Sequence, residues 1–112
     1  MSEKLYKLVI FVPETHLEKV RTAICEAGAG HIGNYDYCTF VTHGIGTFRG
    51  LKGANPAIGK VGKIEEVKEA RLETIVPKAK LKKVIAAMKK SHPYEEVAYD
   101  IHQLHPHPII SI

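Results

Sequence analysis

The chain is poor in the residues and runs that mark several classes of protein. It has no tryptophan and only two cysteines, Cys25 and Cys38, which lack the C-x-x-C spacing of redox and zinc sites and are too few for a secreted disulfide scaffold. The first apolar run, residues 8–12, is too short for a signal-peptide core or a membrane span. We therefore expect a cytoplasmic protein with reduced cysteines and no membrane partner.

The chain also lacks a complete catalytic or nucleotide-binding motif. Residues 28–33 spell G-x-G-x-x-G, but they follow a predicted helix, whereas a dinucleotide fingerprint follows a strand. Residues 53–60 resemble a phosphate-binding loop, yet five residues instead of four separate Gly53 from Gly59, and Val61 replaces the magnesium-binding hydroxyl. Ser91 stands beside a histidine without an assignable orienting acid or oxyanion hole. The sequence therefore favours a non-enzymatic protein.

What is present is typical of one globular domain. The chain has 112 residues, of which 45% are hydrophobic and 25% charged. Much of its net charge of +4 comes from lysines of one predicted helix, at positions 78, 80, 82, 83, 89 and 90. No nucleic-acid module accompanies them, so we predict a solvated helix face and not nucleic-acid binding. We expect a single domain over residues 1–112, with a core at about 5–104 and an extended tail at 105–112.

The strongest internal pattern is a strand-proline-helix unit that occurs twice. Residues 6–12 are almost all apolar, Pro13 ends this predicted strand, and apolar residues then recur at helical spacing over residues 17–27. Thr15 and Glu18 fit a capping box, and Gly28 fits the left-handed end of a helix. An offset of 64 residues places Val12-Pro13 on Val76-Pro77 and repeats the helical pattern. The unit is therefore expected twice in the fold.

Each unit needs one further strand, which we place at residues 36–42 and 97–103. The result is an α+β, ferredoxin-like β-α-β-β-α-β fold, in which a four-stranded antiparallel sheet carries two helices on one face. Residues 44–62 lie between the two units and contain six glycines, so we expect an irregular loop that forms one wall of a ligand site.

The alternation of side chains predicts which residues face the helices. By alternation, the helix side holds Leu8, Ile10, Val12, Leu72 and Val76. The other face then holds Val9, Phe11 and Ile75. Because an apolar outer face needs cover, we expect a homo-oligomer.

Residues 91–100 concentrate the polar chemistry of the chain. In one interpretation His92 only complements the dipole of a helix end, Pro93 stops the helix, and Glu95 and Glu96 are solvated. In the other, strand alternation aims a carboxylate at the glycine-rich loop beside His92, and the pair binds a cation or polar ligand. A second metal candidate is the tail with His102, His105 and His107, whose spacing matches no closed site.

Several segments together resemble a known family. At residues 30–35, 46–49, 53–56, 73–77 and 92–96 the chain resembles the YqfO-type domain of the Nif-three-like family, whose bacterial members are named GTP cyclohydrolase type 2 homologues. The resemblance covers about residues 5–104. The family's dinuclear metal ligands lie outside that stretch, so none is carried over. The domain is similar to CutA and PII proteins, which implies a trimer with ligands in clefts between subunits; after Glu95 the chain departs from the CutA pattern.

We therefore predict a PII/CutA-like homotrimer that binds a small ligand or a divalent metal at subunit clefts, with a regulatory or metal-homeostasis role. The candidate ligand-binding residues are His31, Asn34, Arg49, Asn55, Tyr94, Glu95 and Asp100, and the candidate metal ligands are His92 and Glu96. Two alternatives stay open. One is a metal-dependent hydrolase related to the cyclohydrolase homologues, and the other is an interaction module that docks on a Nif-three-like partner.

Overall fold

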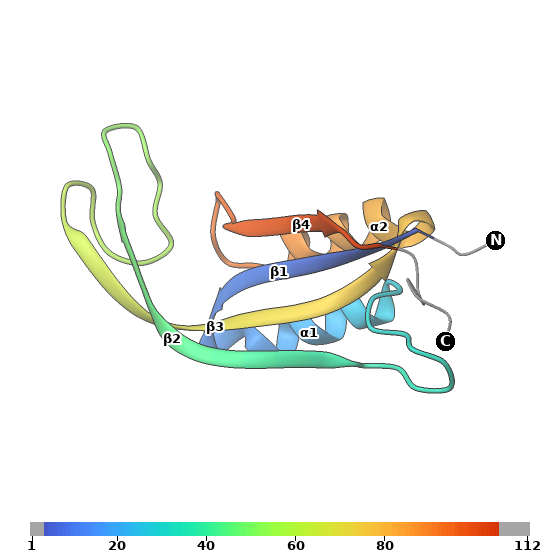
Figure 1. The fold of residues 1–112 in the computed structure, drawn as a ribbon. Coiled ribbons are helices and arrows are strands. Elements are labelled where there is room, and N and C mark those ends of the chain that lie inside the picture. Colours follow the sequence, from blue (N-terminus) through green and yellow to red (C-terminus); the bar gives the residue numbers. More distant parts are fainter. Residues whose placement is uncertain (1–3, 106–112) are drawn as a thin grey trace.

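A computed structural model describes residues 4–105 of the chain. The elements run β1 (Leu5–Pro13), a 3-10 turn η1 (Glu14–His16), α1 (Leu17–Glu26), β2 (Thr39–Arg49), β3 (Ile64–Pro77), α2 (Lys78–Ser91) and β4 (Tyr99–Gln103). All neighbouring strands pair antiparallel in the order β2-β3-β1-β4, and both helices cover the same face of the sheet (Figure 1). The predicted ferredoxin-like fold is confirmed. No helix in this part of the chain is both long and apolar enough to cross a membrane.

The hydrophobic core lies between the helices and the sheet. The predicted helix-side residues of β1 and β3 are fully buried, and they pack with apolar residues of α1 and α2 such as Val20, Ile24, Val84 and Met88. The repeat explains this arrangement, because β1 and β3 are adjacent strands that each end in a proline and feed a helix. Pro13 and Pro77 both leave the chain extended; β3 passes directly into α2, whereas the short turn η1 separates β1 from α1.

The opposite face of the sheet holds the predicted apolar residues, but not all of them are exposed. Val9 belongs to this face, where it lies between Glu73 and Asp100 in the strand register, yet it is only 1% exposed. Its neighbours in the same chain already cover it, so Val9 gives no argument for a partner. Phe11 and Ile75 are half-buried, and Phe40 is 67% exposed. The expectation that a partner subunit covers this face therefore depends on Phe11, Ile75 and Phe40.

The first helix does not begin with the predicted capping box. The short turn η1 is inserted after Pro13, so that His16 occupies the N-cap position of α1 and no side chain caps it. The Thr15 hydroxyl instead lies 2.9 Å from Nδ1 of the neighbouring His16 ring. The prediction for the other end is confirmed, because α1 ends at Glu26 and Gly28 has a φ of +123°.

The second strand and the loop after it were predicted wrongly. β2 starts at Thr39 and continues to Arg49, in continuous register with the long strand β3, so the irregular loop is confined to residues 50–63. Gly44 and Gly46 lie inside the strand, and in this stretch the glycines with positive φ are Gly53, Gly59 and Gly62. Pairing with β3 over its whole length outweighs the weak strand preference of these two glycines. The paired strands form an arm that extends beyond the helices (Figure 1), and the molecule is 54 Å long and 25 × 23 Å across.

The final strand is shorter than predicted. β4 begins at Tyr99 instead of residue 97, and Leu104 donates its backbone N–H to the carbonyl of Leu5 at 2.9 Å. His105 is exposed, and the remainder of the predicted extended tail, residues 106–112, lies outside the described residues.

Candidate functional site

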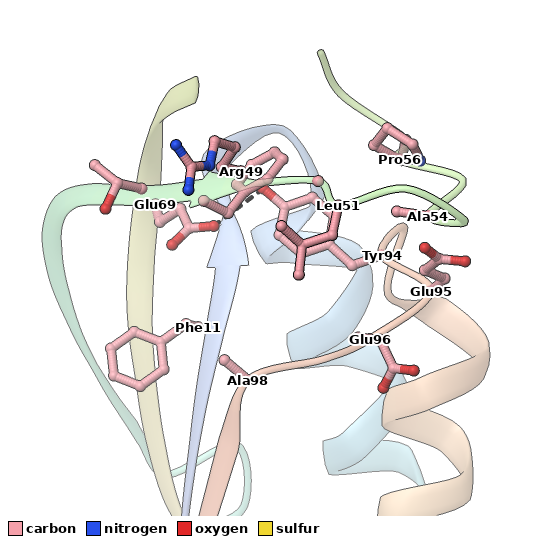
Figure 2. A pocket seen from close by; sticks show the side chains of 14 residues that line it. Phe11, Arg49, Leu51, Ala54, Pro56, Glu69, Tyr94, Glu95, Glu96 and Ala98 are labelled. Atoms are coloured by element: carbon pink, nitrogen blue, oxygen red, sulfur yellow. Dashed lines mark hydrogen bonds between the residues drawn. The ribbon is translucent and has the colours of Figure 1, made fainter. Parts of the chain in front are cut away.

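A cavity of about 420 Å³ lies where the arm meets the segment between α2 and β4 (Figure 2). One wall is the end of β2 and the loop after it, from Thr47 to Ala57. The other walls are Phe11 of β1, Glu69 of β3 and the segment from Tyr94 to Ala98. Phe11 donates its backbone N–H to the carbonyl of Ala98 at 3.1 Å, which joins this segment to the sheet before β4 begins. The cavity is within the usual volume range of small-molecule sites, about 300–1,000 Å³.

His92 fixes the start of the segment from Tyr94 to Ala98 through two hydrogen bonds to backbone groups. The imidazole is buried, its Nε2 donates to the carbonyl of Phe11 at 2.8 Å, and its Nδ1 accepts the backbone N–H of Tyr94 at 3.1 Å. This pattern requires the neutral ring with its proton on Nε2. Burial lowers the pKa of His92, and the acceptor carbonyl of Phe11 opposes that shift only in part. His92 is therefore a neutral brace between two cavity residues.

Ser91 and Pro93 end α2, and the segment from Tyr94 to Ala98 then runs toward the arm. The Ser91 hydroxyl donates to the carbonyls of Ala87 at 2.9 Å and Met88 at 3.1 Å. Pro93 cannot continue the helix, so the chain leaves α2 at His92 in an extended conformation. The Ser91 hydroxyl is thus used in ending the helix.

Tyr94 joins the segment to the arm. Its hydroxyl donates to Oε2 of Glu69 at 3.0 Å, and its ring lies 5.7 Å from the Phe48 ring and 5.1 Å from the His92 ring. Burial and the hydrogen bond to Glu69 both raise the pKa of Tyr94, so the hydroxyl stays a donor. Gly46 makes room for this contact, because a Cβ at that position would collide with the Glu69 carboxylate. The pair fixes one wall of the cavity.

Glu95 ties down the loop after β2. Its Oε1 accepts the backbone N–H of Asn55 at 2.9 Å, across 40 residues of sequence. The base of the same loop is closed by a bond of 2.8 Å from the N–H of Gly62 to the carbonyl of Gly50. These two contacts keep the loop over the cavity.

The structure brings together part of the predicted ligand set. Arg49, Tyr94, Glu95 and Glu96 line the cavity, whereas Asn55 does not line it and only donates its backbone N–H to Glu95. Figure 2 shows Glu95 and Glu96 on one side of Tyr94, and Arg49 and Glu69 on the other. Residues 91–100 and the glycine-rich loop therefore do meet, as one of the two interpretations of residues 91–100 predicted.

Three predicted residues lie elsewhere. His31 and Asn34 are exposed in the connection from α1 to β2, which is attached to the far end of β3 by a bond of 2.8 Å from the N–H of Gly30 to the carbonyl of Ile75. Asp100 is exposed on the open face of β4, opposite Val9. None of the three lines the cavity, so they do not form one site with Arg49 and Tyr94.

The metal assignment to His92 and Glu96 stays a prediction. Within residues 4–105 no group of three or more His, Cys, Asp or Glu side chains is placed to hold a metal ion. His92 would have to give up one of its two backbone partners to act as a ligand. His102 lies on β4 and His105 follows it, while His107 is outside the described residues.

Sequence reasoning missed several residues of the cavity. Glu69 and Phe48 come from the strand extensions that were not predicted, and Leu51 and Pro56 come from the loop. Phe11 was placed on the correct face but not in a site. One signal was available for Glu69, since a glycine inside a strand often marks a close approach by another group.

Comparisons with known proteins place the chain beside one part of larger relatives. No family model matches it. It is 59% identical over 103 residues to the GTP cyclohydrolase 1 type 2 homolog of Halalkalibacterium halodurans and 54% identical over 107 residues to that of Bacillus subtilis, covering 92% and 96% of this chain. The chain matches one segment of these homologues. It spans only about 28% and 29% of their length.

Solved structures agree with this result. A Bacillus cereus protein related to NIF3 superposes with a TM-score of 0.80 at 51% identity, over 93% of this chain and 26% of that protein. CutA from Synechococcus elongatus gives a TM-score of 0.63 at 18% identity, over 93% of this chain and 80% of CutA. GlnK from B. subtilis gives 0.58 at 15% identity, over 90% and 85%. The resemblance to the Nif-three-like segment is confirmed, and CutA and GlnK share its fold.

Proposed function

We propose that the chain is a non-enzymatic binding module, and that its ligand occupies the cavity between the arm and the segment from Tyr94 to Ala98. The observation that carries the proposal is the way the cavity is built. Its walls come from separate parts of the chain and are joined by three hydrogen bonds, from Tyr94 to Glu69, from Asn55 to Glu95 and from His92 to Phe11. Walls that are braced in this way give a site that exists before the ligand arrives, which lowers the cost of binding.

A fragment screen by NMR tests this function. Small aromatic compounds of positive, neutral and negative charge are added to ¹⁵N-labelled protein, and the amide shifts of residues 48–57 and 94–98 are followed. A ligand of the cavity should move these amides first. The variant Ala98→Trp, which fills the cavity, should abolish the shifts, whereas Ala86→Trp on the exposed side of α2 should not. A screen in which no compound moves these amides would reject the proposal.

We also propose that the module is a homotrimer in the cytoplasm with a regulatory or metal-homeostasis role. Support for self-association comes from Phe11, Ile75 and the exposed Phe40 on the open face of the sheet. Native mass spectrometry gives the subunit number directly. Phe40→Asp should dissociate the assembly, and Ala86→Asp on α2 is the matched control; a monomeric parent protein would remove this part of the proposal.

Two further roles remain proposals with their own tests. A divalent metal held by His92 and Glu96 would appear in the same mass spectra as extra mass that a chelator removes. The relatives are named as homologues of a cyclohydrolase, but this chain spans less than a third of their length. Turnover of a nucleotide by the isolated chain would be needed to assign that activity here, and capture of a Nif-three-like protein would support the docking role.

A further inference from the structure

Within residues 4–105, the three carboxylates around the cavity form no ion pair. Glu69, Glu95 and Glu96 line it together with a single basic residue, Arg49, which leaves two excess negative charges in a chain whose overall charge is +4. The ion pairs of residues 4–105 join other acids, so none of the three lies within 4.0 Å of a basic nitrogen in that range. The site is therefore locally opposite in charge to the molecule around it.

The hydrogen bonds that these carboxylates make come from neutral groups. Glu69 accepts from the hydroxyl of Tyr94, and Glu95 accepts from the backbone N–H of Asn55. Each bond uses one oxygen of its carboxylate and brings no compensating positive charge. A carboxylate in ionised form has acceptor capacity for several donors, so capacity remains for a ligand.

The rest of the cavity is largely apolar and aromatic, with walls that include Phe11, Phe48, Leu51 and Pro56. The ring of Tyr94 lies between Glu69 on one side and Glu95 and Glu96 on the other (Figure 2). Aromatic faces attract cations, and Phe11 already does so on the open face, where the guanidinium carbon of Arg71 lies 5.8 Å from its ring centre. The lining thus suits a molecule with an apolar body and a positive head.

Resting on the function proposed above, we infer that the ligand is an organic cation: an amine or amidine joined to an aromatic or aliphatic body. Its apolar part would lie against Phe48, Tyr94 and Leu51. Its charged head would lie toward Glu95 and Glu96, on the side away from Arg49 (Figure 2). A free metal ion fits this lining less well, because the walls are largely apolar and no cluster of three ligands is present in residues 4–105.

Three probes of one shape and different charge test the inference. Phenethylamine, 2-phenylethanol and 3-phenylpropionate are titrated into the full chain, and the shifts of amides 48–57 and 94–98 give the dissociation constants. Phenethylamine should bind at least about tenfold more tightly than the other two, the equivalent of one charge-assisted hydrogen bond. Its affinity should fall as salt is added, because the carboxylates at the rim are exposed.

Matched variants separate the carboxylates from general surface charge. Glu96→Gln and Glu95→Gln should each weaken phenethylamine binding about tenfold, and the glutamine at position 95 can still accept the N–H of Asn55. Glu73→Gln, on the open face of the sheet, should leave it unchanged.

The outcomes distinguish the two proposals. Binding of 2-phenylethanol or 3-phenylpropionate at the same amides as tightly as the amine would overturn the cation and keep the cavity as a binding site. Shifts by the amine that persist in the Glu95 and Glu96 variants would also overturn it. If none of the three probes moves these amides, and the screen above finds no other ligand, the binding function itself fails.

Discussion

Replacing His92 by alanine should cost the fold about 3 kcal/mol. The ring is 6% exposed and bridges the carbonyl of Phe11 and the N–H of Tyr94. Its loss leaves both backbone groups without their protein partner, at about 1–3 kcal/mol for each that water does not reach. Water can reach the N–H of Tyr94, because Tyr94 is half-buried beside an open cavity, so only the carbonyl of Phe11 is expected to stay without a partner. The lost packing of the ring supplies the remainder of the cost of about 3 kcal/mol.

Urea unfolding of variants measures this cost. With a slope of about 1.5 kcal/mol per molar urea, the midpoint of His92→Ala should fall by about 2 M. Asparagine can place an acceptor near Nδ1 and glutamine can place a donor near Nε2, so each should recover part of the loss. His102→Ala, at an exposed position of β4, should change stability by less than about 0.5 kcal/mol. If the two alanine variants unfolded at the same urea concentration, the buried hydrogen bonds of His92 would not stabilise the fold.

Three other predictions follow from the same site. The pKa of His92 is lowered in the fold, so on acidification the unfolded chain binds this proton first, near pH 6.5. The contribution of His92 to the free energy of unfolding should therefore be fully present above that pH. Below it, the free energy of unfolding should fall by up to about 1.4 kcal/mol per pH unit, until the folded ring also binds its proton. Urea unfolding at several pH values should show this slope in the parent and lose it in His92→Gln. Gly46→Ala should displace the carboxylate of Glu69 and thereby remove the bond from Tyr94, so its effect and that of Tyr94→Phe should not add in a double-mutant cycle; full additivity would count against the contact. Glu95→Ala should speed hydrogen exchange in residues 51–57 while the free energy of global unfolding changes by less than about 0.5 kcal/mol; unchanged exchange would mean that the loop is held by other contacts.

The fold was predictable because the repeat encodes it locally. Apolar strands that end at Pro13 and Pro77, each followed by helical periodicity, are enough to define two units whose hydrophobic faces must pack together. The alternation in β1 and β3 then placed Leu8, Ile10 and Leu72 correctly against the helices. Alternation overestimated the exposed apolar surface of the open face, because it says which side Val9 occupies but not how completely its neighbours cover it.

The candidate site was predictable only in part. Arg49, Tyr94, Glu95 and Glu96 were found because they belong to two stretches that stand out by composition. His31 was included although it belongs to neither stretch, since it lies in a segment of the family resemblance, and it is at the other end of the sheet. Composition marks unusual residues, whereas shared membership in a site depends on which chain segments meet.

The order of elements, the faces of the inner strands and the polar character of residues 91–100 follow from the amino-acid pattern, since these depend on neighbours a few positions away. The continuation of β2 through Gly44 and Gly46 is visible only in the folded chain, because that pairing is with residues of β3 more than 20 positions later. The folded chain alone shows that His92 braces a carbonyl 81 residues away and that Glu95 holds a loop 40 residues away. Contacts at such separations depend on the register and packing of the whole sheet, which no local pattern in the chain contains.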